Sequence, residues 1–194
     1  MARAQEDGDH AKKKTTLYAE RSELQRALYG MELRDWLAAL HPVAYVDQCG
    51  MDHRLMRTYG RALRGEKVRA DVCGKRKGRT SVIAAWRDGR LLAPVTFQGH
   101  CNSALVEACF ATALLPALRK GTLVVLDNAS FHRSRELARI VEEAGCHLLF
   151  LPPYSPDLNP IEPAWASLKR VVSKGLPSAQ CKFSFITSIC QCYS

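Results

Sequence analysis

The order of β-rich and helical segments is the feature that most constrains how this 194-residue chain can fold. A short apolar run at 43–46 precedes two β-rich runs, at 80–86 and 90–97, which meet near Asp88-Gly89. An Asp-Gly pair between two such runs is a strong hairpin signal, because both central residues of a tight hairpin turn have positive φ. The three runs therefore predict one strand followed by a β-hairpin.

Strands and helices then alternate through the rest of the chain. The expected strands lie at 122–126 and 147–151, and the expected helices run over 102–118, from Ser130 or Ser134 to 144, and over 159–173. A hairpin followed by alternating strands and helices gives a sheet with antiparallel and parallel strands, joined by right-handed crossovers. The sequence thus predicts an α/β fold, with a mixed five-stranded sheet that has helices on both faces.

Three regions are expected along the chain. The N-terminal region, 1–40, is a polar tail followed by a helix at 17–40, where leucines recur at roughly helical spacing, and Pro42 would stop this helix. A globular domain is expected over 41–175 and a tail without clear periodicity over 176–194. A domain of this size can bury a sizeable core without disulfides or a structural metal.

Composition excludes several classes of protein. Hydrophobic residues make up 47% and charged residues 24% of the chain, which is ordinary for a globular protein and argues against wholesale disorder. No apolar run approaches the ~20 residues of a membrane span, and the first residues lack the apolar core of a secretion signal. The eight cysteines include no Cys-x-x-Cys pair, so we expect reduced thiols rather than a disulfide framework or a zinc site.

The positive charge is concentrated in one segment. The whole chain carries a formal charge of +9, and residues 53–79 contain ten basic and two acidic residues, which leaves +8 in that stretch. A concentrated basic surface favours a polyanion, most commonly nucleic acid, although a solvated basic loop without a partner stays open. The candidate DNA contacts in this stretch are Arg54, Arg57, Arg61, Arg64, Lys75, Arg76, Lys77 and Arg79.

Three acidic residues stand where a site is expected in an α/β sheet. Asp47 and Asp127 each end an apolar strand, and Glu162 lies on the first turn of the last helix, with 34 residues between it and Asp127. Sites in such sheets gather beyond the carboxyl ends of strands. Three converging carboxylates in a basic protein favour Mg²⁺ or Mn²⁺, and two such ions can activate the attacking oxygen and stabilise the leaving oxygen of a phosphodiester.

Each of these acids also has a purely structural interpretation. Asp47 and Asp127 can simply end their strands in turns. Glu162 stands three residues after Asn159, with Pro160 next to that Asn, which is the spacing of a capping box. A capping role does not exclude metal binding, because the second carboxylate oxygen is left to face a site.

Each of three residues near these acids has more than one expected role. His132, five residues after Asp127, is a candidate DNA contact, with orientation of a carboxylate or burial near a helix start as the alternatives. Asn128 is expected either to form a hydrogen bond near the metals or to serve the turn. Trp165 stands three residues after Glu162, where a place in the core is favoured over a base-stacking platform.

Three stretches around these acids resemble the motifs of a known family. Val124-Val-Leu-Asp127-Asn-Ala-Ser-Phe-His132 resembles the second-aspartate motif of the insertion-sequence branch of the Tc/mariner transposases. Leu151-Pro-Pro-Tyr-Ser-Pro-Asp-Leu-Asn-Pro-Ile-Glu162-Pro-Ala-Trp165 resembles the third-acid motif of that family, and this long string rarely arises elsewhere. Tyr45-Val-Asp47-Gln is similar to the first-aspartate strand, where a Glu more usually follows the Asp.

The resemblance covers roughly residues 40–173 and implies a fold, a cofactor and a reaction. It implies an RNase H-like catalytic domain in which Asp47, Asp127 and Glu162 bind two divalent ions, Mg²⁺ or Mn²⁺. The implied activity is that of a DDE transposase, which cleaves double-stranded DNA at transposon ends and transfers the strand to a TA-type target. A cytoplasmic, nucleoid-associated bacterial protein is the expected setting.

The chain departs from the family at its N-terminal side. Members carry N-terminal helix-turn-helix modules, whereas about 40 residues precede the first expected catalytic strand here, and the helix at 17–40 resembles the linker that follows those modules. We therefore expect an upstream helix-turn-helix portion in cis or in trans, and a homodimer is a further expected assembly. The alternatives are a truncated transposase that only binds DNA or a partner chain, and a host RNase H-like nuclease.

Overall fold

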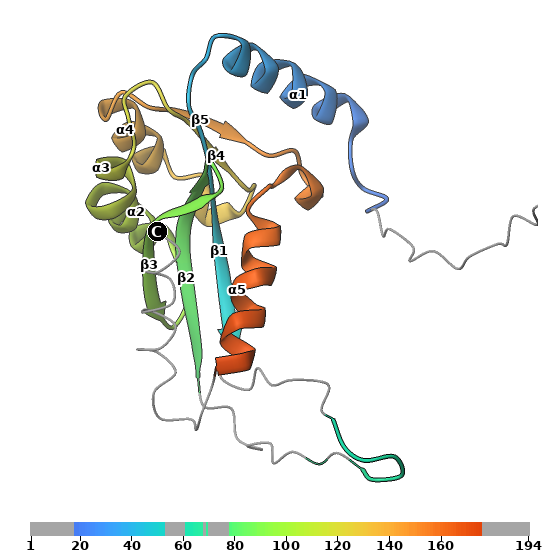
Figure 1. Cartoon of the computed structure of the whole chain (residues 1–194). Helices are drawn as coiled ribbons and strands as arrows, with labels where there is room; N and C mark the ends of the chain where they lie inside the picture. Colours follow the sequence, from blue (N-terminus) through green and yellow to red (C-terminus); the bar gives the residue numbers. More distant parts are fainter. Residues whose placement is uncertain (1–17, 53–60, 68, 70–77, 176–194) are drawn as a thin grey trace, which may run out of the picture.

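A five-stranded mixed sheet organises the part of the chain that the computed structural model describes, residues 18–52, 61–67, 69 and 78–175 (Figure 1). The order of strands and helices confirms the predicted alternation. The elements are α1 (Glu23–Ala38), β1 (Val43–Asp52), β2 (Arg79–Arg87), β3 (Arg90–Gln98), α2 (Ser103–Cys109), the π-helical turn η1 (Phe110–Leu114), α3 (Leu115–Ala117), β4 (Leu123–Leu126), the 3₁₀ turn η2 (Ser130–His132), α4 (Arg135–Glu143), β5 (His147–Phe150), the 3₁₀ turn η3 (Pro156–Leu158) and α5 (Glu162–Gly175).

The sheet combines an antiparallel half with a parallel half, as predicted. Its strand order is β3-β2-β1-β4-β5, in which β2 runs antiparallel to β1 and β3, while β4 runs parallel to β1 and β5. Asp88 and Gly89 form the turn between β2 and β3 with φ angles of 52° and 82°. Two consecutive positive φ angles are the signature of the tight hairpin turn that this dipeptide predicts.

Strand β1 is longer than its apolar run indicates. It continues to Asp52 because β2 pairs with it over its whole second half, whereas β4 pairs only with its first four residues. Cys49 and Met51 are buried on the side of α5, and this alternate burial extends the strand beyond the run that sequence patterning detects. The predicted strand end at Asp47 is therefore wrong, and Gly50 lies inside the strand.

Helices cover both faces of the sheet, which confirms the expected layering (Figure 1). On one face, α2, η1 and α4 pack against the sheet through a core that includes Phe110 and Leu137. On the other face, α5 packs on β1 and β2 through Trp165 and Leu168, and α1 packs on β4 and β5 through Tyr29. The first face thus has one apolar core and the second face has two, one under α5 and one under α1.

Two helices differ from their predicted form. Ser134, rather than Ser130, caps α4, because its Oγ accepts a hydrogen bond from the N–H of Leu137 at 2.9 Å. The helix expected over 102–118 contains the π-helical turn η1 shortly before Pro116, whose nitrogen carries no proton for a helical hydrogen bond. Within the described ranges, no helix has both the length and the apolar character that crossing a bilayer requires.

The cysteines of the described residues are separate thiols. Cys49, Cys109 and Cys146 are buried and Cys101 is half-buried, and none of these four is disulfide-bonded. Burial raises the pKa of each of the four thiols, so that they stay protonated at neutral pH. The other four cysteines lie outside the described residues.

Candidate active site

The two predicted aspartates lie side by side where β4 ends. Val46 of β1 stands beside Leu126 of β4 in the parallel register, so the residues that follow, Asp47 and Asp127, are neighbours at this point of the sheet. Glu162 opens α5, which packs on the face of the sheet that carries Asp47. All three carboxylates line one cavity of about 530 Å³. The structure thus brings together the three acids that the sequence singles out.

Asp47 is held by two hydrogen bonds and is electrostatically coupled to the other acids. Its Oδ1 accepts from the backbone N–H of Gln48 at 2.7 Å, and its Oδ2 accepts from Nε1–H of Trp165 at 3.1 Å. The pKa of Asp47 is raised to about 6, chiefly by burial; the negative charges of Asp127 and Glu162 add to this rise, and the two hydrogen bonds oppose it. A bound cation would therefore strongly stabilise the ionised form of this carboxyl group.

Asp127 has the opposite electrostatic setting because of His132. The ring Nδ1 of His132 lies 2.5 Å from Oδ1 of Asp127, and the same oxygen accepts from the N–H of Ala129 at 3.2 Å. Burial by itself would raise the pKa of Asp127, but these hydrogen bonds and the histidine charge hold it below its ordinary value. Asp127 is therefore ionised at neutral pH.

The position of His132 decides between its expected roles. Only 3% of the residue is exposed, since η2 turns the ring inward against Asp127. This geometry favours orientation of a carboxylate over the predicted DNA contact, because a buried ring paired with Asp127 does not present itself to a phosphate. Asn128 serves the turn, as its Oδ1 accepts from Nε–H of Arg133 at 2.5 Å.

Glu162 does not take part in a complete capping box. Oδ1 of Asn159 accepts from the N–H of Ile161 at 3.4 Å, so the asparagine caps this helix end. The backbone N–H of Asn159, which a reciprocal bond would use, donates instead to the carbonyl of Pro156 at 3.0 Å. The carboxylate of Glu162 is exposed and lines the cavity, where it remains accessible to a ligand.

Trp165 joins the core to the site. Its side chain is 2% exposed and packs with Leu168 and Met51, which confirms the core position favoured by the sequence. The sequence interpretation missed that its Nε1–H donates to Asp47. The available signal was general, because a buried indole N–H usually finds an acceptor.

A contact between α1 and the proline-rich loop also escaped sequence reasoning. Arg26 of α1 forms a two-pronged ion pair with Asp157, with Nη1–Oδ1 and Nη2–Oδ2 distances of 3.0 and 2.7 Å. The Arg26 hydrogen bonds hold the pKa of Asp157 below its ordinary value. Nearby, the rings of Tyr18 and Tyr154 lie 5.8 Å apart, and Tyr154 has a left-handed backbone with φ 55°. We call these two contacts the α1–loop clasp.

Residues of the α1–loop clasp line the cavity that holds the three acids. Tyr18 and the proline-rich loop, residues 151–156, line the same cavity as the three acids. The first residues described in the chain therefore form part of its wall. Strained backbone such as that of Tyr154 is frequent at functional sites, where surrounding contacts hold it in place.

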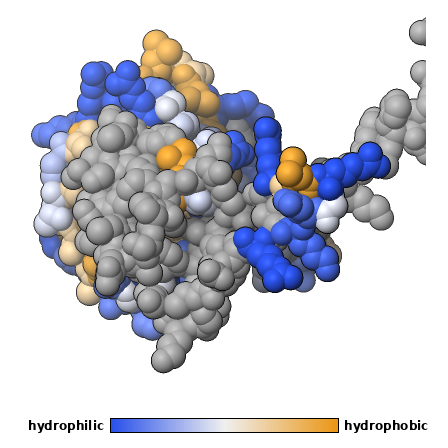
Figure 2. All heavy atoms as spheres, turned by 60° about the horizontal axis from the view of Figure 1, so that its bottom comes forward, coloured by the Kyte–Doolittle hydropathy of each residue, from blue (hydrophilic) through white to orange (hydrophobic). Residues whose placement is uncertain are grey.

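The predicted basic contacts are only partly described. Arg61 and Arg64 are exposed in the segment 61–67, and Arg79 is exposed at the start of β2. In Figure 2, which brings the lower end of Figure 1 forward, hydrophilic residues make up much of the described surface and hydrophobic ones form separate patches. The other candidates lie outside the described residues: Arg54, Arg57, Lys75, Arg76 and Lys77.

The donor set fits a divalent cation by its chemistry. Three carboxylates supply hard oxygen ligands in one cavity, and their mutual repulsion contributes to the raised pKa of Asp47. Among the described residues, no three His, Cys, Asp or Glu side chains already stand in a geometry that would hold a metal ion. Because Glu162 is exposed on the first turn of α5, a change of its rotamer is enough to alter that geometry.

Comparison with protein families gave one match. The sequence profile described as "DDE superfamily endonuclease" matches residues 42–183. Comparison with curated proteins gave no match.

Solved structures of the Mos1 transposase share the fold. The Mos1 paired-end complex with the left transposon end matches with a TM-score of 0.74 at 18% identity, over 97% of this chain and 60% of that chain. The Mos1 strand transfer complex matches with a TM-score of 0.66 at 18% identity, over 97% and 65%. The Mos1 catalytic domain with raltegravir and Mg matches with a TM-score of 0.60 at 14% identity, over 92% and 85%.

These matches establish an RNase H-like fold, as expected from the sequence. At identities of 14% to 18% the likeness is one of fold. The chain spans 60% of the length of the Mos1 chain in the paired-end complex.

Proposed function

This chain belongs to the DDE superfamily endonucleases, and on that basis we propose that it is the catalytic domain of a transposase, which cleaves DNA and transfers the cut strand. The observation that carries the proposal is the single cavity lined by Asp47, Asp127 and Glu162. The solved structures of the same fold include a transposon-end complex and a strand transfer complex of Mos1, which supports this reaction over simple hydrolysis.

We further propose that the three carboxylates hold two Mg²⁺ or Mn²⁺ ions. Mos1 structures of the same fold were solved with Mg and with Mn. When bound, such ions supply Lewis-acid activation of the phosphodiester and offset the charge that develops on its oxygens. A basic protein with this acidic cavity combines attraction for DNA with a site for the cations that cleavage requires.

The chain's own residues position these ligands. Gln48 and Trp165 each donate to one oxygen of Asp47 and so fix the plane of its carboxylate. His132 contacts Oδ1 of Asp127 and leaves Oδ2 as the oxygen for a ligand. Partners behind metal ligands set ligand orientation, and their loss typically costs 10- to 100-fold in metal affinity or activity.

The proposed substrate is double-stranded DNA, at transposon ends and at a TA-type target. We propose that residues 41–175 form the catalytic domain, that α1 within 1–40 is the linker from a helix-turn-helix portion supplied in cis or in trans, and that 176–194 form a tail. The α1–loop clasp supports the linker role, because it joins α1 to the wall of the cavity. A homodimer is part of the same proposal.

Nicking of a supercoiled plasmid that carries an element end tests the function. The wild-type chain should nick it with Mg²⁺ and not with EDTA, and Asp127→Asn should be slower by at least about 100-fold. Asp88→Asn, which changes an exposed acid in the β2–β3 turn, is the matched control and should nick normally. DNA binding without metal-dependent nicking by the wild type would instead identify a fragment that only binds DNA.

A further inference from the structure

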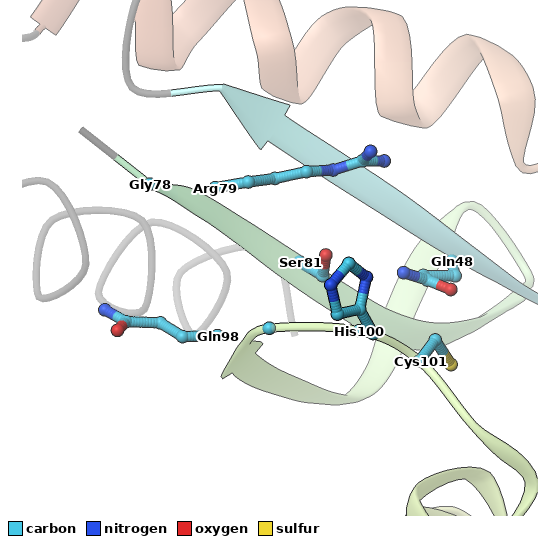
Figure 3. Close-up of a pocket in the computed structure, with 8 residues that line it drawn as sticks. Gln48, Gly78, Arg79, Ser81, Gln98, His100 and Cys101 are labelled. Atoms are coloured by element: carbon cyan, nitrogen blue, oxygen red, sulfur yellow. The ribbon is translucent and has the colours of Figure 1, made fainter. Parts of the chain in front are cut away.

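A second cavity, of about 430 Å³, is lined by residues of β1, β2 and the segment after β3 (Figure 3), and it lies on the opposite face of the sheet from Asp47. Gln48 follows Asp47 in β1, and because successive side chains of a strand point to opposite faces, it lies on the face of α2 and α4. We call this cavity the Arg79 pocket. Its lining residues are Gln48, Gly78, Arg79, Ser81, Gln98, Gly99, His100 and Cys101.

The guanidinium of Arg79 lies against Gly50 of β1, and we call this place its seat. A Cβ atom on Gly50 would lie 1.9 Å from both Nε and Nη2 of Arg79, so the guanidinium occupies the space that a side chain at position 50 would fill. Figure 3 shows the Arg79 side chain extended from β2 towards β1. A glycine inside a strand weakens it and often marks a close approach of another group. Here that group is the guanidinium of Arg79.

The chemistry of the pocket suits an anion with several oxygen acceptors. Among the residues that the structure describes, no Asp or Glu lines the pocket, and none of the ion pairs between described residues involves Arg79. Gln48, Ser81 and His100 add polar side chains around the guanidinium. An arginine fork matches the geometry of phosphate oxygens, and most protein–DNA hydrogen bonds go to the backbone.

The Arg79 pocket adjoins the carboxylates across one strand. In the described part of the chain, β4 ends beside Val46, so that Gln48 and the following residues of β1 pair with β2 alone. Burial raises the pKa of the Cys101 thiol, and Cys109 and then Asp127 add to this shift, which places Asp127 within electrostatic reach of the pocket wall. Gln48 of the pocket wall directly follows Asp47 in β1, so the pocket lies near the carboxylates although it opens on the other face of the sheet.

We propose that the Arg79 pocket binds a backbone phosphate of the DNA strand that is cut, adjacent to the phosphate at the three carboxylates, with Arg79 as the principal contact. The proposal rests on the proposed function, since it assigns a second contact to the same substrate. This contact differs from a general attraction of DNA by the basic residues of 53–79, because it requires Arg79 in its position against Gly50.

Binding of a labelled DNA duplex, followed by fluorescence anisotropy in EDTA at several salt concentrations, tests the proposal. Arg79→Gln should weaken binding about tenfold and reduce the slope of log K against log salt by about 0.9, the value for one phosphate contact. Arg90→Gln removes the same charge from an exposed position at the opposite end of β3 and should leave affinity and slope close to wild type.

Gly50→Ala tests whether the position of the Arg79 guanidinium matters as well as its charge. It keeps every charge but places a Cβ where the guanidinium lies, so it should lose affinity to a similar degree as Arg79→Gln. Thermal unfolding confirms that each compared variant is folded, and Arg79→Gln alone decides the test if Gly50→Ala does not fold. Equal effects of Arg79→Gln and Arg90→Gln, or wild-type binding by folded Gly50→Ala, would overturn the proposal.

Binding in EDTA keeps this test independent of catalysis. Metal-dependent nicking by the wild type together with unchanged binding by Arg79→Gln would reject the pocket and leave the proposed function standing. Binding that depends on Arg79 together with no nicking by the wild type would reject the proposed function and keep a phosphate contact at this pocket.

Discussion

Asp47 should make the metal-free protein less stable at neutral pH than it is in acid. Burial raises its pKa to about 6 from an ordinary value of 3.8. A carboxyl with a raised pKa binds its proton more tightly in the folded state, so its contribution to stability is complete below pH 3.8 and is lost as the pH rises through 6. The shift of roughly two pKa units corresponds to a loss of about 3 kcal/mol at neutral pH.

Replacing Asp47 by asparagine should recover most of this loss. Asn is nearly the same shape but carries one carbonyl oxygen for the two donors, the N–H of Gln48 and Nε1–H of Trp165. Loss of one of these hydrogen bonds costs about 1 kcal/mol. Asp47→Asn should therefore be about 2 kcal/mol more stable than wild type at pH 7.5 in EDTA, and no more stable at pH 4.

Urea unfolding between pH 4 and pH 8 measures this difference. Asp88→Asn is the control, because Asp88 is exposed in a turn, and its stability difference from wild type should not change across this range. Added Mg²⁺ should stabilise the wild type more than Asp47→Asn, since a ligand of the folded state adds stability. A difference between wild type and Asp47→Asn that stays constant from pH 4 to 8 would refute the assignment of Asp47 to a buried, negatively charged cavity.

Two further predictions concern the residues around the carboxylates. His132→Asn should weaken Mg²⁺ binding 10- to 100-fold in calorimetric titration, because it removes the ring that orients Asp127; an unchanged affinity would mean that the contact is only structural. Arg26→Asp should slow plasmid nicking several-fold by opening the α1–loop clasp, and Arg26→Asp combined with Asp157→Arg should restore most of the rate; failure of the double variant would show that the ion pair does not position the loop.

Local signals were sufficient for most elements. The Asp88-Gly89 turn, the apolar strands and the capping serine of α4 are all encoded within a few residues, and each is present in the structure. The position of Asp127 directly after an apolar strand was also a local signal. Such features depend on neighbours in sequence, which periodicity and turn chemistry report.

The features that escaped prediction depend on partners far away in the chain. Residues 47–52 belong to β1 because β2 pairs with them, and no apolar run marks that pairing. The ion pair of Arg26 with Asp157 spans 131 residues, and the seat of Arg79 requires a glycine in the neighbouring strand. These contacts form only when the sheet has assembled, so local residue patterns do not predict them.

The central claim is that Asp47, Asp127 and Glu162 form the divalent-metal site of a DNA-cleaving enzyme. Crystals soaked in Mn²⁺ test it most directly, because manganese gives an anomalous X-ray signal. We expect anomalous density between these three carboxylates in the wild type, and none there in Asp127→Asn. Wild-type crystals at saturating Mn²⁺ with no anomalous density in this cavity, or with density only at other acidic residues, would contradict it.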